Sequence, residues 1–149
     1  MTTDQYLSGP EDLRRRELVW GFVREPPSPF ASHQLITTRL SALLDQHVRE
    51  HELGTVLAAP MDVVLDVERD LVLQPDVMFI SQARSAIIRD FVRGAPDLVV
   101  EVASPGTARY DRHDKVRWYR AYGVRECWLV DSQRQAVTVL DLSSHADGV

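Results

Sequence analysis

Two acidic residues lie in stretches that otherwise have the composition of buried strands. Glu101 lies inside PDLVVEVASP (96–105), and Asp76 follows Pro75 in LVLQPDVMFI (71–80). Burying a carboxylate is unfavourable unless a cation or hydrogen-bond donors pair with it. Two carboxylates on adjacent strands could share one divalent cation, and Mg²⁺ prefers such oxygen ligands while it retains several waters. Asp76 and Glu101 are therefore candidate metal ligands.

Lys115 is the third candidate, at the end of the sequence DRHDK (111–115). Asp111 and Lys115 are four residues apart and would share one face of a helix. A lysine close to these acids could stabilise negative charge that develops in a transition state. The spacing equally allows a solvent-exposed Lys115 that pairs with Asp111.

The two acids also have structural interpretations. Glu101 could form a buried ion pair with an arginine, without any metal. Asp76 could shape a turn or cap a strand after Pro75. The sequence alone leaves both alternatives open.

The spacing of apolar residues predicts the elements that must position these side chains. An amphipathic helix is expected over 33–51, ending near Gly54, and a second helix over 108–123, ending at Gly123. Strands are expected at 55–60, 62–67, 71–80, 97–104, 125–131 and 136–142, with Pro75 marking a bulge or a strand start. Residues 17–25 are expected to form a short strand pair or one bent strand. Residues 97–104 are almost continuously apolar, which is typical of a central strand covered on both faces. The order of elements predicts an α/β fold with a mixed β-sheet flanked by helices.

The bulk composition fits one soluble domain. The chain has 149 residues, of which 44% are hydrophobic and 26% charged, with a net charge of −5. No apolar run approaches the roughly 20 residues that span a bilayer, so no membrane association is expected. A single cysteine excludes an internal disulfide and favours a reducing compartment, the cytoplasm. We expect a polar, mobile segment at 1–16, one domain at 17–142 and a shortened tail at 143–149.

Basic residues concentrate in one segment of this acidic chain. Residues 109–125 contain six lysines and arginines and two aspartates, a local charge of +6 − 2 = +4. Such a patch can bind phosphates despite the overall negative charge. Arg109 and Arg112 are the candidate nucleic-acid contacts, whereas Arg117 and Arg120 are expected on a solvated helix face.

Several motifs, taken in order, resemble the Uma-type family of restriction endonucleases in the PD-(D/E)XK nuclease superfamily. The motifs are QPDV (74–77), GAPDLVVEVASP (94–105), D-x-x-x-K-x-x-x-Y (111–119) and YGVRECWLVD (122–131). The opening segment RRELVWGFVREPPSPFASHQLI (15–36) is also similar. The likeness implies a restriction-endonuclease-like core and a Mg²⁺- or Mn²⁺-dependent endonuclease acting on DNA, with RNA as an alternative substrate.

The resemblance also implies roles for individual residues. Asp76 and Glu101 would bind the metal, and Glu17 and His33 would complete the pocket, with His33 near the nucleic acid. Both Glu17 and His33 also allow purely structural roles. The superfamily carries a lysine two residues after the glutamate, where this chain has Ala103, so the lysine role would pass to Lys115.

Two further expectations follow from the resemblance. By analogy with nucleases that cut both strands, a homodimer is expected. The alternative function is a nuclease-like fold that binds nucleic acid or protein without turnover. The missing lysine at position 103 and the short C-terminus favour this alternative.

Overall fold

The computed structural model describes residues 1–10, 14–105 and 108–144. Most of the expected tail, residues 145–149, lies outside them, as does the side chain of Asp111. Within this part of the chain, no helix is long and apolar enough to cross a membrane.

The first of two sheets is mixed and has five strands. Its order is β2 (Phe22–Arg24), β1 (Glu17–Val19), β5 (Leu71–Leu73), β4 (Val63–Asp66) and β7 (Val92–Arg93). β4 and β7 are parallel and the other neighbours antiparallel. The predicted strand pair over 17–25 is present as β1 and β2, and Gly21 adopts a positive φ of 83° in the turn between them.

The second sheet is also mixed and has five strands. Its order is β10 (Ala136–Asp141), β9 (Glu126–Asp131), β8 (Leu98–Ala103), β6 (Val77–Ser81) and β3 (Gly54–Ala58). β8 is parallel to β9 and antiparallel to β6. The strand expected over 97–104 is therefore central, with a neighbour on each side.

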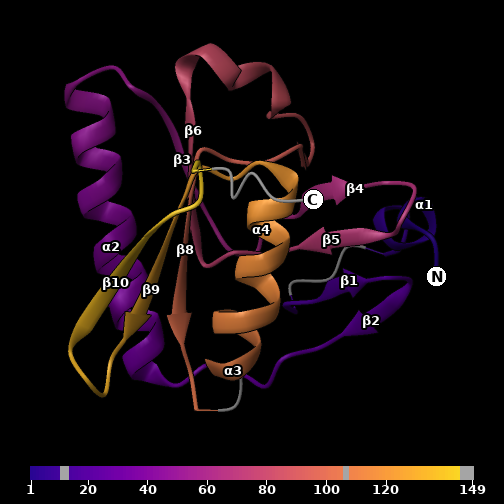
Figure 1. Cartoon of the computed structure of the whole chain (residues 1–149), viewed down its shortest axis with the longest axis horizontal. Coiled ribbons are helices and arrows are strands. Elements are labelled where there is room, and N and C mark those ends of the chain that lie inside the picture. Colours follow the sequence, from indigo (N-terminus) through magenta and orange to yellow (C-terminus); the bar gives the residue numbers. More distant parts are fainter. Residues whose placement is uncertain (11–13, 106–107, 145–149) are drawn as a thin grey trace.

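Helices cover both faces of the second sheet (Figure 1). α2 (Ala31–Glu50) packs through Ile36, Leu40 and Leu44 on the face that carries Val100 and Val102 of β8. The other face carries Val99 and meets the helical segment formed by α3 (Ala108–Tyr110), a π-helical turn (Asp111–Lys115) and α4 (Val116–Tyr122). A short 3₁₀ helix (Gln82–Ile87) follows β6. Alternation along β8 thus directs successive side chains to α2 and to α4.

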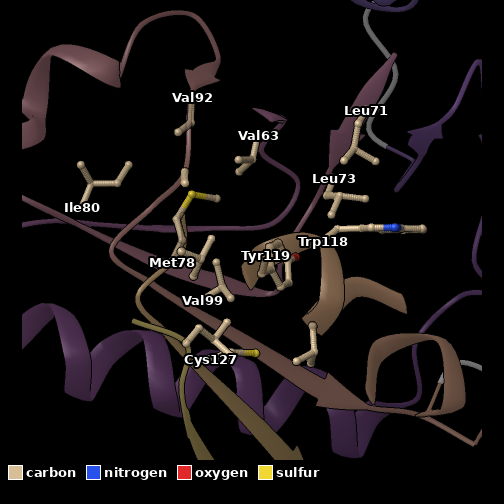
Figure 2. Close-up of a cluster of buried hydrophobic side chains, with 14 of the residues drawn as sticks. Val63, Leu71, Leu73, Met78, Ile80, Val92, Val99, Trp118, Tyr119 and Cys127 are labelled. Atoms are coloured by element: carbon tan, nitrogen blue, oxygen red, sulfur yellow. The ribbon is translucent and has the colours of Figure 1, made fainter. Parts of the chain in front are cut away.

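The main hydrophobic core lies between the two sheets and α4. Figure 2 shows Leu71 and Leu73 of the first sheet near Trp118, and Tyr119 beside Met78 and Val99 of the second. Tyr119, Met78 and Val99 have no exposed surface. The core therefore fixes α4 against both sheets, and with it the residues that precede α4.

The predicted α/β fold is confirmed, but the structure differs in two details. There are two mixed sheets instead of one, and the strand expected over 71–80 is divided into β5 and β6. Pro75 has no N–H to donate to a sheet ladder, so the chain leaves the first sheet after Leu73 and enters the second at Val77. Asp76 lies at this passage.

The N-terminal segment contains an ordered element. α1 (Thr3–Leu7) buries Thr3 and Tyr6, and the Thr3 N–H donates to Asp70 at 2.6 Å. The division of the chain at residue 17 stays a prediction.

Candidate active site

Asp76 and Glu101 lie close together at one end of the pairing between β6 and β8. Val77 pairs with Val100 in antiparallel register, and each acid lies one residue beyond this pair, Asp76 in the connection before β6 and Glu101 within β8. One side chain, that of Arg15, contacts both carboxylates. The Val102 N–H donates to Oδ2 of Asp76 at 2.6 Å and holds this loop against β8. Because both acids are buried, their mutual repulsion must be offset by nearby positive charge.

Arg15 supplies one of the positive charges and bridges the two acids. Its Nη1 lies 2.6 Å from Oδ1 of Asp76, and its Nη2 lies 3.6 Å from Oε2 of Glu101. Nη2 also donates to the carbonyl oxygen of Gln74 at 2.6 Å. A planar guanidinium is suited to several acceptors at once. The side chain is 26% exposed, so Arg15 closes the acid pair from the solvent side.

Lys115 supplies the second positive charge from the interior. Its Nζ lies 2.7 Å from Oε1 of Glu101 and 2.8 Å from Oε1 of Glu17, and the side chain is 1% exposed. Lys115 ends the π-helical turn, a feature that often occurs at functional sites because it redirects the following side chains. Lys115 is thus a buried residue that joins the two sheets, and not a solvent-exposed one.

Two tyrosine hydroxyl groups donate hydrogen bonds to the glutamates. Tyr119 donates from Oη to Oε1 of Glu101 at 2.5 Å, and Tyr110 donates to Oε2 of Glu17 at 3.1 Å. The N–H of Gln74 also donates to Glu17 at 3.0 Å. Burial and the adjacent Glu101 carboxylate raise the pKa of Tyr119 well above its ordinary value, so this hydroxyl remains a donor.

His33 contacts Asp76 on the side of α2. Its Nε2 lies 3.4 Å from Oδ2 of Asp76, and its Nδ1 lies 3.5 Å from Oγ1 of Thr37. Burial raises the pKa of Asp76, but the contact with His33 and the charge of Arg15 outweigh it, so the pKa lies below its ordinary value of 3.8. Asp76 is therefore ionised at neutral pH.

Glu17 brings a third carboxylate from β1. Burial raises its pKa, but the charges of Lys115 and Arg15 outweigh that effect, and the net pKa lies below the ordinary value of 4.5. The site thus combines three carboxylates with two cationic side chains.

A hollow of about 620 Å³ opens over this group. Its lining includes Arg15, Glu17, His33, Asp76 and Lys115. A volume of this size is typical of ligand sites in proteins.

A shallower hollow of about 440 Å³ adjoins the first, and both are lined by Arg24 and Tyr110. The guanidinium carbon of Arg24 lies 3.8 Å from the centre of the Tyr110 ring. Arg109 lines only this second hollow. Arg112 is turned to β9, with Nη2 at 2.9 Å from Oδ2 of Asp131. The structure therefore brings five of the sequence-predicted residues together and places these two arginines outside that group.

The donor set can be tested against a metal ion. Among the described side chains, no group of three or more His, Cys, Asp or Glu is arranged to hold a metal. Mg²⁺ and Mn²⁺ are compatible, since Mg²⁺ is commonly held by one or two carboxylates with water and substrate phosphate. Oδ1 of Asp76 and Oε2 of Glu101 both face one cationic group, Arg15, so the pair fits a shared cation.

Sequence reasoning missed Arg15 and the two tyrosine contacts. Arg15 lies in the RRRE run next to Glu17, which gave a signal of charge but no indication of which arginine points inward. The alternative interpretation of Glu101 as the partner of an arginine matches its contact with Arg15, while Lys115 contacts the other oxygen of the same carboxylate.

Comparison with known proteins gives a family and a fold. Residues 3–147 match the model of the Uma2 family, described as "Putative restriction endonuclease". No curated protein matches the chain. A similar solved structure is that of "a putative nuclease belonging to DUF820" from Anabaena variabilis. It is 20% identical with a TM-score of 0.79, over 97% of this chain and 82% of that one. At this identity the structural match establishes the fold alone.

Proposed function

The chain belongs to the Uma2 family, and on this premise we propose that it is an endonuclease that hydrolyses phosphodiester bonds of DNA with Mg²⁺ or Mn²⁺. The observation that supports the proposal is the proximity of the buried Asp76 and Glu101, both in contact with Arg15, with Lys115 also in contact with Glu101. A purely structural scaffold does not need two buried acids side by side. Sharing a divalent cation would give this pair of acids a function.

In this proposal Asp76 and Glu101 would hold the cation, which would activate water and neutralise charge on the phosphate. The N–H of Val102 and the ring of His33 fix Oδ2 of Asp76. Lys115 and Tyr119 fix Oε1 of Glu101, so both carboxylates are preorganised.

Lys115 has a second role, because it is one of the residues that line the hollow in which the phosphate would lie. A fixed positive charge there stabilises the negative charge that develops during hydrolysis. Glu17 keeps Lys115 in place from the opposite sheet.

Nucleic acid would extend from the larger hollow over Arg24 into the second, where Arg109 contacts a phosphate. Arg112 would contribute at the edge of this surface, since its side chain is 39% exposed beside Asp131. His33 would act through Asp76 rather than on the nucleic acid itself. Cutting of both strands would require two copies of the chain, and we retain the homodimer as part of the proposal.

A nuclease activity assay tests the proposal. Supercoiled plasmid DNA is incubated with the chain and Mg²⁺ or Mn²⁺, and nicking is followed on gels, with single-stranded RNA as a parallel substrate. Asp76→Asn and Glu101→Gln should each reduce cutting at least about a hundredfold, because each removes a ligand charge. The matched control is Asp45→Asn, an exposed acid on α2 that pairs with Arg49 at 3.7 Å. Cutting that persists in both site variants would refute the assignment.

A second candidate is a binding module without turnover. It is favoured by the contacts of Arg15 with both acids, which would suffice for a purely structural charge cluster. This candidate predicts nucleic-acid binding that survives both site substitutions, together with no cutting under either metal.

A further inference from the structure

Arg15 contacts the same two oxygens that the proposed metal would use. Oδ1 of Asp76 lies 2.6 Å from Nη1, and Oε2 of Glu101 lies 3.6 Å from Nη2. The remaining oxygen of each acid is held by other groups of the protein. A guanidinium and a divalent cation are both positive and need the same side of the same carboxylates, so they exclude each other there.

The two cations of the site differ in their freedom to leave. Lys115 is 1% exposed and lies between Glu17 and Glu101. Arg15 is 26% exposed and belongs to residues 14–16, which precede β1 and form no helix or strand. Moving Arg15 would expose its guanidinium to water without opening the core, whereas moving Lys115 would break a buried ion pair between the two sheets.

We propose that Arg15 is a built-in competitor of the divalent cation. Its guanidinium holds Asp76 and Glu101 together until the cation binds, and it moves aside into the hollow when the cation takes its place. This inference rests on the proposed function, because it requires a metal at these two acids. It assigns to the segment before β1 a role in setting the metal affinity of the site.

The expected consequence is a reduced apparent affinity for the metal. Each binding event must first break the contacts of Arg15 with the two acids and with the carbonyl of Gln74. A binding site that is competent in only a fraction of molecules has its affinity lowered by that fraction. Removing the guanidinium should therefore tighten metal binding, the opposite of what removing a ligand does.

Isothermal titration of the whole chain with Mn²⁺, in the absence of nucleic acid, tests this directly. Arg15→Gln should lower the Kd for Mn²⁺ about tenfold or more, since hydrogen bonds between charged groups no longer oppose binding. Arg15→Lys should give an intermediate Kd, because an ammonium keeps the charge but cannot bridge two acids as a fork does. Arg14→Gln is the matched control: it removes the same charge one residue away, where the side chain is 72% exposed.

Thermal unfolding gives a second readout that does not depend on activity. Without added metal, Arg15→Gln should unfold at a lower temperature than the wild type, because the acids repel each other. Mn²⁺ should then raise its unfolding temperature by more than it raises that of the wild type. If Arg15→Gln does not fold, the proposal is tested by comparing the Kd for Mn²⁺ of Arg15→Lys with that of the wild type.

The outcomes separate the two proposals. If Mn²⁺ binds to wild type, is lost in Asp76→Asn, and binds no more tightly in either Arg15 variant, the competitor role of Arg15 is refuted and the metal site stands. If Mn²⁺ binds to none of these proteins, the metal-dependent function fails, and the inference about Arg15 fails with it.

Discussion

The contribution of Glu17 to the stability of the fold depends on whether its carboxylate is ionised. Its carboxylate accepts from Lys115, Tyr110 and the N–H of Gln74, and all three interactions favour the ionised form. A folded-state pKa below the unfolded one stabilises the protein above the unfolded pKa, and this stabilisation is lost as the pH falls through the folded pKa. The pKa of Asp76 is also lowered in the folded state, so its contribution to stability is likewise lost as the pH falls. The contribution of these two acids to stability therefore decreases at low pH and does not change at alkaline pH.

A pH series of urea unfolding tests this for Glu17. At neutral pH, Glu17→Gln should cost about 1–3 kcal/mol, because Lys115 loses one carboxylate. As the pH falls below the ordinary value of 4.5, the wild type should lose its advantage and approach the variant, since a protonated Glu17 resembles glutamine. Glu50→Gln, an exposed change on α2, should run parallel to wild type throughout. A difference between wild type and Glu17→Gln that is constant from neutral pH to pH 3 would contradict the role assigned to this acid.

At the scale of elements, periodicity predicted the two long helical segments and most strands, because core-facing positions must repeat with the local geometry. The passage at Pro75 was not predictable in the same way. LVL and VMFI are both apolar, and only the missing N–H of Pro75 marks the change of sheet. The π-helical turn, which ends at Lys115, was not predicted from the sequence. Asp76, Glu101 and Lys115 could be proposed from motifs, whereas Arg15 depends on a tertiary contact.

Two glycines provide an element-level test of the second sheet. Gly54 begins β3, and a Cβ there would lie 2.1 Å from the carbonyl oxygen of Ile80 on β6. Gly123 ends α4 at a φ of 95°, and a Cβ there would meet nothing within 4 Å. Gly54→Ala should therefore cost about 3 kcal/mol or more through overpacking, and Gly123→Ala about 1–2 kcal/mol through the left-handed backbone alone. Urea unfolding followed by circular dichroism gives both values, and a larger cost at Gly123 would contradict the close pairing of β3 with β6.

At the scale of the whole molecule, the site lies where the two sheets meet. β1 contributes Glu17, the connection between β5 and β6 contributes Asp76, and β8 contributes Glu101. Lys115 joins acids of the two sheets, so the relative position of the sheets and the geometry of the site depend on each other. The overall charge of −5 opposes nucleic-acid binding, and any affinity for a polyanion must come from local arginines around the hollows.

The salt dependence of DNA binding measures that local contribution. If Arg24 and Arg109 each neutralise a phosphate, the affinity for a short duplex should fall with rising salt. Each substitution, Arg24→Gln or Arg109→Gln, should then reduce the slope of log K against log salt by about 0.9. Arg134→Gln is the control, because this arginine lies in the turn between β9 and β10, away from both hollows, and contacts Asp131. Fluorescence anisotropy without divalent metal isolates binding from cutting. A general loss of positive charge affects both variants alike. Equal changes in slope for Arg109→Gln and Arg134→Gln would therefore mean that the second hollow does not contact the backbone of the nucleic acid.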